Sequence, residues 1–437
     1  MPRHLLFIWL AMSALSGCVE ITAAWADLDP SGKETARPPL AIPSGPQAVH
    51  AWESESRPDL QRRLQEAIYG IMPSNGQTAV LEKRVLDPAA FSGAGTLEKW
   101  TLNVRGEFAE AAFSSGPMQV HVLIPHNRPG PHPIILIQSF CPARSTLQHP
   151  AMTDPDDDAG SGGIFGAVAT YVFGRFICTP PVEDILASGY GIAIIDQYAF
   201  VPDDSTAGLA TLREFAKSND ETKTRWGAIG AWGWLYARVA EAVERDPRIN
   251  ADAVIAWGHS RYAKAALVAA AFFPQIDGVI AHQSGTGGAS LNWNKPGESV
   301  RGIIKNYPHW FAPGYADFID ASDGKGPRPD LDQHMLLALI APRPVFLGNA
   351  RRDVWSDPNG AFRAAKGAQP AYALYGATGL NVGRLNEFEP AAELAFWLRP
   401  GTHGVVEEDW PAFLQFLYAH FPATNRKSCA SKASKCQ

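Results

Sequence analysis

The chain has 437 residues, of which 46% are hydrophobic and 19% are charged, and its formal net charge is −6 at pH 7. This composition excludes a disordered chain and predicts a globular protein with a sizeable core. The negative charge balance and the lack of a long basic run argue against nucleic acid as a partner.

The N-terminal segment predicts export, with residues 1–26 as a signal peptide. Residues 5–15 form an apolar run that is too short to span a bilayer comfortably. Two processing alternatives stay open: a small-x-small cleavage site before Asp27, and a lipobox-like stretch at 15–18 that would lipidate Cys18. We therefore expect a periplasmic or extracellular protein, anchored through Cys18 in the second alternative, with no transmembrane segment.

Three further regions follow the signal. Residues 27–58 are rich in Pro, Ser and Gly, and they predict a linker or an extended N-terminal arm. Residues 59–423 carry regular hydrophobic patterns and predict one folded domain, whereas residues 424–437 form a polar tail.

The five cysteines allow disulfides once the chain has been exported. Cys141 could pair with Cys178, and Cys429 with Cys436, but sequence does not decide connectivity. There is no CxxC motif, which argues against a structural zinc site or a thioredoxin-like redox site.

The first half of the folded region predicts a helix followed by several strands. The helix is expected over 60–71, and runs rich in β-branched residues predict strands over 79–86, 97–105, 119–124, 133–138 and 191–195. The acidic loop at 152–166 lacks the spacing of a calcium-binding EF-hand and favours a solvated loop.

A long helix is expected over 226–244. Its tryptophans allow two interpretations, a sugar-binding platform or core packing, and their helical spacing favours the core. Strands follow at 253–258, 278–283 and 344–349, with helices at 264–272 and 412–421. Apolar strands that alternate with helices predict an α/β fold, a mostly parallel sheet covered by helices on both faces.

Ser260 lies between the strand at 253–258 and the helix that follows it, in a Gly-x-Ser turn. A strand, a sharp turn and a helix are the setting in which a serine becomes a nucleophile. A lone Gly-x-Ser is common, so the hypothesis requires an acid and a histidine further along the chain. Asp353 follows the strand at 344–349, and His403 lies between a further predicted strand and the last helix. This order of serine, acid and histidine at strand ends is that of an α/β-hydrolase.

These motifs resemble a known family. The stretch GHSRYAKAA at 258–266 is similar to the signature of glucuronoyl esterases, carbohydrate esterase family 15, and the bacterial branch is the most similar. The similarity covers about residues 100–420 and continues through 283–291, 297–298, 307–311, 332–345, 353–358 and 401–403.

The resemblance implies a single α/β-hydrolase catalytic domain that cleaves esters between (4-O-methyl)glucuronic acid on xylan and lignin alcohols. It implies Ser260 as the nucleophile and His403 as the base, with Arg261 helping to hold the oxyanion. In the family, the residues that match Lys264, Glu298 and Trp355 contact the sugar. We expect a monomer that needs no metal and no organic cofactor.

Three departures from the family pattern affect this interpretation. Gln283 stands where many members carry the acid of the triad, so Asp353 must supply the carboxylate or the triad is impaired. Ala263 replaces the glycine of the signature, and the segment at 139–142 differs from the usual one. Two alternatives therefore remain: an esterase of the same fold that acts on other carbohydrate or small acyl esters, and a non-catalytic carbohydrate-binding relative.

Overall fold

The computed structural model describes residues 38–108, 111–153, 172–217, 222–293 and 296–423. The predicted export signal, the polar tail with its cysteines and most of the acidic loop lie outside the described residues. Among the helices that the structure describes, none combines the length and the apolar character needed to cross a bilayer.

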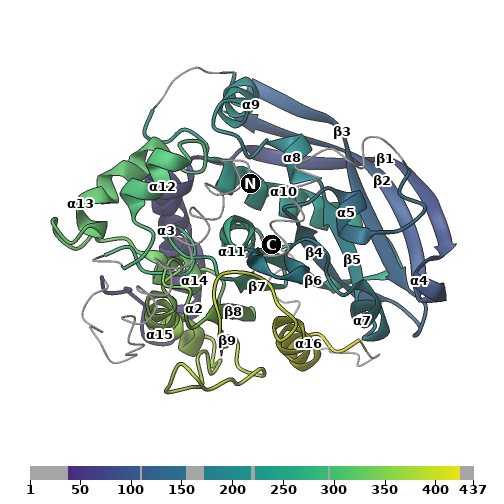
Figure 1. Ribbon diagram of the computed structural model, residues 1–437. Helices are drawn as coiled ribbons and strands as arrows, with labels where there is room; N and C mark the ends of the chain where they lie inside the picture. The colour runs from purple at the N-terminus through teal and green to yellow at the C-terminus, as the bar shows by residue number, and fades with distance from the viewer. Residues whose placement is uncertain (1–37, 109–110, 154–171, 218–221, 294–295, 424–437) are drawn as a thin grey trace, which may run out of the picture.

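The described part of the chain contains a nine-stranded sheet in the order β1-β2-β3-β5-β4-β6-β7-β8-β9 (Figure 1). The strands are β1 (Ser74–Ala89), β2 (Gly95–Phe108), β3 (Ala111–Pro125), β4 (His132–Gln138), β5 (Gly191–Ile195), β6 (Ile249–His259), β7 (Gly278–His282), β8 (Val345–Ala350) and β9 (Leu394–Arg399). The last six strands of that order pair in parallel, whereas β1, β2 and β3 are antiparallel and β3 joins them to β5. The predicted mostly parallel sheet is confirmed.

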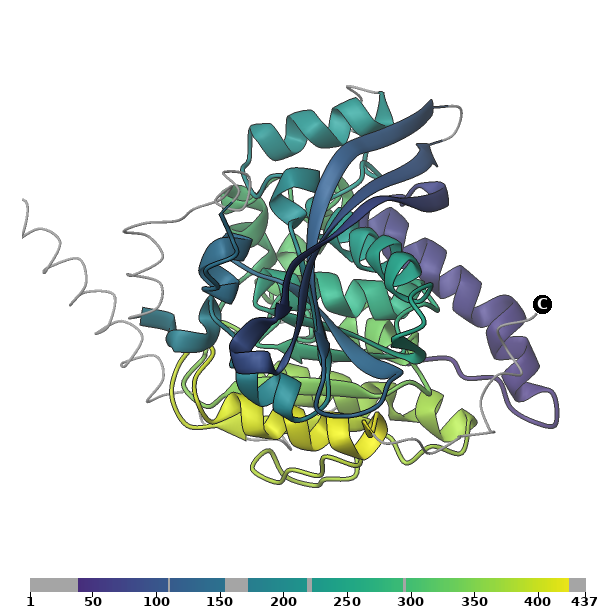
Figure 2. The same ribbon diagram turned by 90° about the vertical axis from the view of Figure 1, so that its right-hand side faces the viewer.

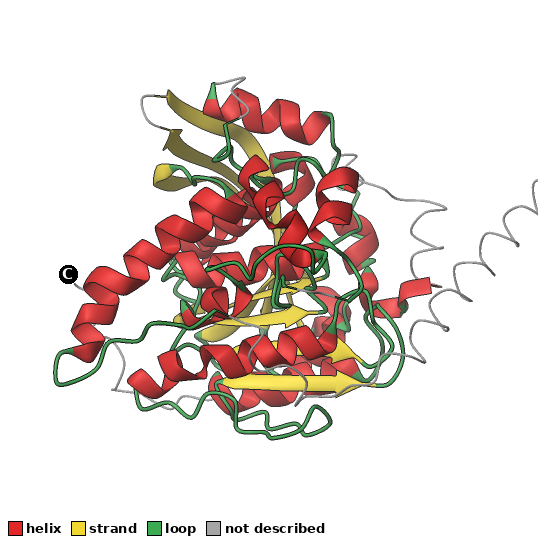
Figure 3. Ribbon diagram, turned by 90° about the vertical axis from the view of Figure 1, so that its left-hand side faces the viewer, coloured by secondary structure: helices red, strands yellow, loops and turns green. Residues whose placement is uncertain are grey.

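Helices cover both faces of the sheet (Figures 2 and 3). One face carries the N-terminal helical segment together with α9 (Ala207–Ala216), α10 (Ala228–Val243), α11 (Arg261–Phe272), α14 (Gln333–Ala338) and α15 (Pro358–Leu374). The other face carries α4 (Ala90–Gly93), α5 (Ala143–Leu147), α7 (Val182–Ala187) and α16 (Asp409–His420). The shorter helices are η5 (Arg175–Ile177), α8 (Gln197–Phe200), α12 (Val300–Asn306), η6 (Pro313–Phe318) and α13 (Ile319–Ser322).

The strand β4 shows why the sheet is covered on both faces. All seven of its residues are buried, and successive side chains point to opposite faces. Ile134 and Leu136 join the core on the α10 and α11 face, whereas Ile135 and Ile137 join the core on the α16 face. A strand that is apolar throughout is stable only with helices on both sides.

The first helical segment begins earlier than expected. It runs without a break from α2 (Ala48–Ala51) through η2 (Trp52–Ser56), α3 (Arg57–Leu64) and η3 (Gln65–Tyr69). The prediction placed the helix at 60–71 and a linker or extended arm up to residue 58, so the boundary is corrected. One apolar side of the segment is buried against the core, which holds the otherwise polar helix in place: Trp52, Leu60, Leu64 and Ile68.

The long helix α10 is buried in all but one of its positions. Trp232 and Trp234 are at most 1% exposed, which confirms core packing for these residues and rules them out as a sugar platform. The first N–H groups of α10 donate to the carbonyls of His309 and Trp310, at 2.8 and 3.0 Å. This helix therefore fixes the backbone of a loop that borders the site described below.

Candidate active site

Ser260 lies at a sharp turn from β6 into α11, at the carboxyl edge of the parallel strands. Its backbone has φ 56° and ψ −120°, a conformation that costs a non-glycine residue about 1–3 kcal/mol. Its N–H donates to the carbonyl of His282 at 2.9 Å. A Cβ at Gly258 would lie 2.2 Å from the carbonyl oxygen of Tyr262, so this turn requires glycine. The geometry is that of a nucleophile elbow, which presents the serine hydroxyl above the sheet.

The two unusual residues of the elbow are both buried. Tyr262 is 3% exposed, and its ring centroid lies 4.8 Å from that of Phe140 and 5.3 Å from that of Trp232. Ala263 is completely buried in the packed face of α11. The turn thus accommodates a large residue at 262 because the side chain packs into the core beside the site.

Asp353 and His403 form a hydrogen-bonded pair. The Asp353 carboxylate, which follows β8, lies with Oδ2 2.7 Å from Nδ1 of His403. Its other oxygen accepts the backbone N–H of Ser356 at 3.1 Å. Burial alone would raise the pKa of Asp353, but the nearby His403 and the hydrogen bonds from His403 and Ser356 hold that pKa below its ordinary value. An ionised carboxylate on Nδ1 leaves Nε2 as the proton acceptor of the ring.

The histidine loop lies beside the elbow. The ring of His259, the residue that precedes Ser260, has its centroid 4.6 Å from that of His403. The sequence placed Ser260, Asp353 and His403 after three different strands, and the structure gathers them at one edge of the sheet. Ser260 thus directly follows the residue whose ring lies against His403, and His403 is bonded to Asp353.

Gln283, which follows β7, bonds to the backbone of the loop that carries His403. Its Oε1 accepts the N–H of Gly404 at 2.7 Å, and its carbonyl accepts the hydroxyl of Ser356 at 3.3 Å. The side chain is 1% exposed. The uncharged amide of Gln283 therefore supports the residue after His403. The carboxylate that bonds to the His403 imidazole belongs to Asp353.

A buried ion pair that sequence analysis missed holds the same loop. Arg399 ends β9, and its Nε donates to both carboxylate oxygens of Asp409 at 2.9 and 3.0 Å. Its Nη2 donates to the carbonyls of Thr402 and Gly404 at 3.1 and 2.8 Å. Arg399 and Asp409 are 3% and 0% exposed. This pair therefore fixes the backbone on both sides of His403.

Replacing Asp409 with asparagine should lower stability in a pH-dependent way. Burial would raise the pKa of Asp409, but His282 and Arg399 hold it below the ordinary value of about 3.9. The stabilisation is therefore fully present above that pH and is lost as the pH falls through the folded-state pKa. At pH 7, breaking the buried pair should cost about 3–5 kcal/mol.

The measurement is the Tm of wild type and Asp409→Asn between pH 3 and 7. We expect the difference in Tm to shrink below pH 4, because protonation removes the same charge from the wild type. Asp330→Asn is the matched control, since its carboxylate is 93% exposed. A Tm difference that stays constant over the whole pH range would contradict this account.

Arg261 is the first residue of α11, and its guanidinium is held at the rim of the elbow. It pairs with Asp203, in the loop between α8 and α9, and lies over the ring of Trp310 at 4.6 Å from the centroid. Sequence analysis singled out Arg261 but missed Asp203. The two residues are 58 positions apart, and no motif marks the aspartate.

The three residues predicted to contact substrate form a connected row. Lys264 donates to the carbonyls of Ser284 and Thr286 at 2.5 and 2.8 Å, and its Nζ lies 3.6 Å from Glu298 Oε2. The other Glu298 oxygen accepts the indole N–H of Trp355 at 3.2 Å. Lys264 and Glu298 are 3% and 7% exposed, whereas Trp355 is 59% exposed. Core packing is therefore excluded for Trp355, and Lys264 is mainly engaged in holding the loop after β7.

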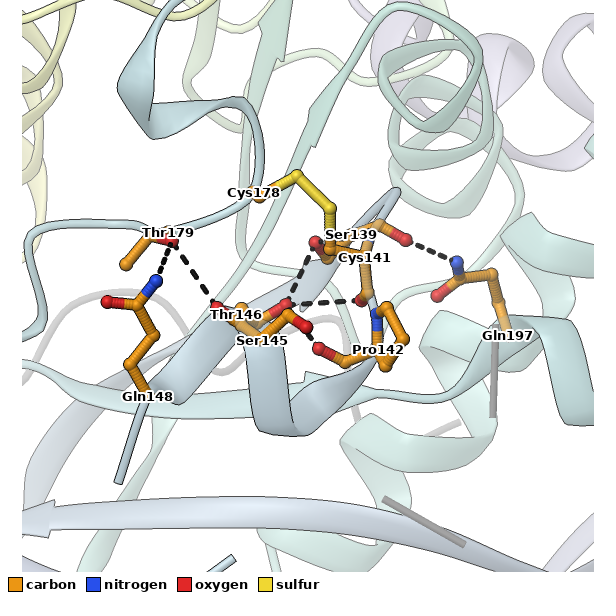
Figure 4. The surroundings of a disulfide bond; sticks show 9 residues. All are labelled: Ser139, Cys141, Pro142, Ser145, Thr146, Gln148, Cys178, Thr179 and Gln197. Atoms are coloured by element: carbon orange, nitrogen blue, oxygen red, sulfur yellow. Dashed lines mark hydrogen bonds between the residues drawn. A yellow bond between two sulfur atoms is a disulfide. The ribbon is translucent and has the colours of Figure 1, made fainter. Parts of the chain in front are cut away.

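The loop after β4 packs beside the elbow, with the ring centroid of Phe140 4.8 Å from that of Tyr262. Figure 4 shows this loop around its disulfide. Cys141 in this loop forms a disulfide with Cys178, so one of the two pairings that the sequence left open is present. The carbonyl of Ser139 accepts the side-chain amide of Gln197 at 2.7 Å, and the hydroxyl of Thr146 lies 3.1 Å from that of Ser139. The predicted departure at 139–142 is thus a loop cross-linked to the segment that follows residue 172. Among the described residues, there is no group of three or more His, Cys, Asp or Glu side chains suited to a metal ion.

Comparisons with known proteins agree with this geometry. A family described as "Glucuronyl esterase, fungi" matches residues 218–376. The carbohydrate esterase MZ0003, from an unknown prokaryotic organism, is 29% identical over 403 residues, which are 89% of this chain and 90% of its own. The solved structure of the glucuronoyl esterase from Solibacter usitatus superposes with a TM-score of 0.71 at 26% identity, over 88% of this chain and 98% of that one. The chain is therefore similar over most of its length to bacterial glucuronoyl esterases of carbohydrate esterase family 15.

The fungal members of the family are similar over a shorter stretch. The 4-O-methyl-glucuronoyl methylesterase of Hypocrea jecorina is 32% identical over 161 residues, which are 34% of either chain. The described sheet and helices match the bacterial structure over most of their length. The predicted fold and the predicted resemblance to glucuronoyl esterases are confirmed.

Proposed function

We propose that this protein is an exported serine esterase that hydrolyses esters between (4-O-methyl)glucuronic acid on xylan and the alcohols of lignin. The observation that carries the proposal is the Asp353–His403 pair, 2.7 Å apart, next to a strained serine elbow. Similarity to relatives that are named 4-O-methyl-glucuronoyl methylesterases supports glucuronate esters as the substrates of this esterase chemistry.

The proposed reaction has two half-reactions. Ser260 Oγ attacks the uronate carbonyl carbon while His403 Nε2 takes the hydroxyl proton, and the negative charge that forms on the carbonyl oxygen meets the backbone N–H of Arg261. When the ester bond breaks, His403 returns the proton to the departing alcohol. Water then attacks the acyl-enzyme with His403 again as the base, which releases the uronic acid and restores Ser260. Asp353 stays ionised and holds the imidazole in the required tautomer.

The row formed by Lys264, Glu298 and Trp355 is the proposed sugar-binding side of the site. Lys264 is one helical turn from Ser260, and its N–H donates to the Ser260 carbonyl at 3.2 Å. The exposed Trp355 ring offers an apolar face for a pyranose, and the Glu298 carboxylate can accept hydrogen bonds from hydroxyl groups. The buried Lys264 ammonium keeps Glu298 in place beside the indole.

A second candidate is an esterase of the same fold that prefers other carbohydrate or small acyl esters. The cross-linked loop after β4 motivates this alternative, because it lines a pocket beside the elbow together with Tyr262. The two candidates share Ser260, His403 and Asp353 and differ only in the group that binds. A substrate comparison therefore separates them.

We expect the wild type to hydrolyse benzyl or methyl glucuronate with a kcat/KM at least about tenfold above that for p-nitrophenyl acetate, a difference of about 1.4 kcal/mol. Trp355→Ala should raise KM for the glucuronate ester about tenfold and leave hydrolysis of the acetate nearly unchanged. Tyr418→Ala is the matched control, because Tyr418 is an aromatic residue of α16 with 67% exposure. The measurement is steady-state kinetics of all three proteins on both esters.

A preference for the simple ester would favour the second candidate. Inactivity on both esters would favour the non-catalytic carbohydrate-binding alternative. Equal effects of Trp355→Ala on both substrates would contradict its role in sugar binding.

The proposed location is the periplasm or the outside of the cell. The signal-like residues 1–26 and the lipobox-like Cys18 lie outside the described residues, so cleavage and lipid anchoring are both kept as alternatives. The disulfide between Cys141 and Cys178 supports export, because disulfides persist mainly in oxidising compartments.

A further inference from the structure

Asp203 is a largely buried carboxylate that receives three side-chain donors from distant parts of the chain. Its Oδ2 pairs with Nη1 of Arg261. Its Oδ1 lies 2.8 Å from the indole nitrogen of Trp310, which donates to it, and 3.1 Å from Nε2 of His309. The side chain is only 10% exposed. Such a carboxylate ties the elbow helix α11 to the loop after α12.

Asp203 is ionised at neutral pH. Burial would raise its pKa, but the hydrogen bond from His309, the charge of Arg261 and the indole N–H of Trp310 together hold the pKa below the ordinary value. The neighbouring Asp204 caps a helix instead: its Oδ1 accepts hydrogen bonds from the N–H groups of Thr206 and Ala207 at the start of α9. The sequence pair Asp-Asp thus contains one helix cap and one carboxylate directed at the elbow.

Arg261 is held in one orientation. Its guanidinium carbon lies 4.6 Å from the ring centroid of Trp310 and 5.3 Å from those of Tyr307 and Phe140. Tyr307 and Trp310 are themselves stacked, with centroids 3.8 Å apart. Only Nη1 bonds to Asp203, and Arg261 Nε is buried without a hydrogen-bond partner among the described residues. One edge of the guanidinium is therefore fixed by Asp203, and its plane is held among three aromatic rings.

We propose that Asp203 is a positioning residue of this esterase, which fixes the Arg261 guanidinium beside the nucleophile so that it can stabilise the oxyanion. The inference rests on the proposed function. A cation at the first position of α11 meets the positive end of the helix dipole, at a cost of about 0.3–1 kcal/mol, and the Asp203 carboxylate offsets that cost. An arginine side chain has several rotatable bonds, and only a fixed one is already in place when charge develops on the substrate oxygen.

A competing effect has the opposite sign. The negative charge of Asp203 also weakens the positive field of Arg261 at the oxyanion. If orientation dominates, neutralising Asp203 slows the reaction, and if the field dominates, the same change accelerates it. The proposal commits to the first outcome, because the carboxylate also fixes Trp310, on whose ring the guanidinium lies.

The test is a double-mutant cycle of wild type, Asp203→Asn, Arg261→Gln and the double variant, with kcat and KM measured for benzyl glucuronate. We expect Asp203→Asn to lower kcat roughly 10- to 100-fold with a much smaller change in KM, as for the loss of a group that acts in the transition state. In the Arg261→Gln background, Asp203→Asn should change kcat less than about twofold, because the guanidinium that Asp203 positions is already absent.

Equal losses in both backgrounds, or a rise in kcat in Asp203→Asn, would overturn the proposal. Asp204→Asn is the matched control, an exposed neighbour whose loss should affect the Tm slightly and kcat not at all. If Asp203→Asn does not fold, the cycle is run with Asp203→Glu, which keeps the negative charge but moves the carboxylate away from its native position.

The inference and the proposed function fail in different ways. If the wild type does not hydrolyse glucuronate esters but cleaves p-nitrophenyl acetate, the substrate proposal fails and the cycle is measured on the acetate. Coupling between Asp203 and Arg261 on that ester would still support the positioning role, and its absence would refute it.

Discussion

Ser260→Ala should reduce kcat for a glucuronate ester by about 10⁶-fold, the loss seen when the nucleophile of a serine triad is removed. Without Oγ no acyl-enzyme can form, and the His403 base has no proton to take. The residual rate should be that of water attacking an ester that is merely bound and polarised. Steady-state and single-turnover kinetics at high enzyme concentration measure this loss.

The Ser260→Gly variant is the matched partner of Ser260→Ala. Both remove the hydroxyl, but the φ of 56° at this position is strained for alanine and readily adopted by glycine. We therefore expect two equally inactive proteins, with the glycine variant more stable by about 1 kcal/mol. Activity in either variant well above the uncatalysed rate would show that another residue is the nucleophile.

Asp353→Asn should reduce kcat by about 10⁴-fold and leave KM nearly unchanged. The asparagine has nearly the same shape, so the packing around this 2%-exposed site is retained. It can, however, present an N–H to Nδ1 of His403, which favours the tautomer that carries the proton on Nε2 and cannot act as the base. The loss should appear in kcat because the imidazolium is stabilised only as the proton moves.

The control for this prediction is Asp353→Asn combined with Gln283→Glu. A glutamate at 283 would restore a carboxylate near the site, but the side chain at this position bonds to Gly404 N–H and not to Nδ1 of His403. We therefore expect at most a partial recovery. A nearly wild-type rate in Asp353→Asn alone would show that the acid of this site is not Asp353, whereas full recovery in the double variant would show that a carboxylate at 283 can also reach His403.

The buried groups around His403 hold the backbone of its loop. Gln283 and Arg399 bind the backbone of Gly404, and Asp409 holds Arg399. A loop held by an ion pair and by amide hydrogen bonds keeps the imidazole within the small tolerance that proton transfer requires. Asp409→Asn should therefore lower stability and also loosen the loop that carries His403.

The sequence by itself determined the parallel half of the fold and the position of the serine. The runs at 133–137 in β4 and 253–257 in β6 are apolar throughout, a pattern typical of a strand buried on both faces. The Gly-x-Ser turn between β6 and α11 is equally local, because glycine at 258 and serine at 260 depend on neighbouring backbone atoms. Asp353 and His403 were predictable from their places directly after two strands.

Other elements escaped sequence analysis because local signals pointed elsewhere. The helix from Ala48 to Tyr69 is mostly polar and contains a proline at residue 58, which resembles a linker until its one apolar side is packed. α15 contains Pro370 in its interior, a residue that usually ends a helix. In both segments tertiary packing outweighs local propensity.

Only the tertiary structure decided how the site is held together. The distance of 2.7 Å between Asp353 and His403 and the contact of Asp203 with Arg261 join residues 50 and 58 positions apart. The Arg399–Asp409 pair spans just ten positions, yet it was also invisible, because an arginine and an aspartate are ordinary surface residues until a fold buries them together. Charge pairing depends on distance and burial, and a linear chain specifies neither until its sheet and helices are packed.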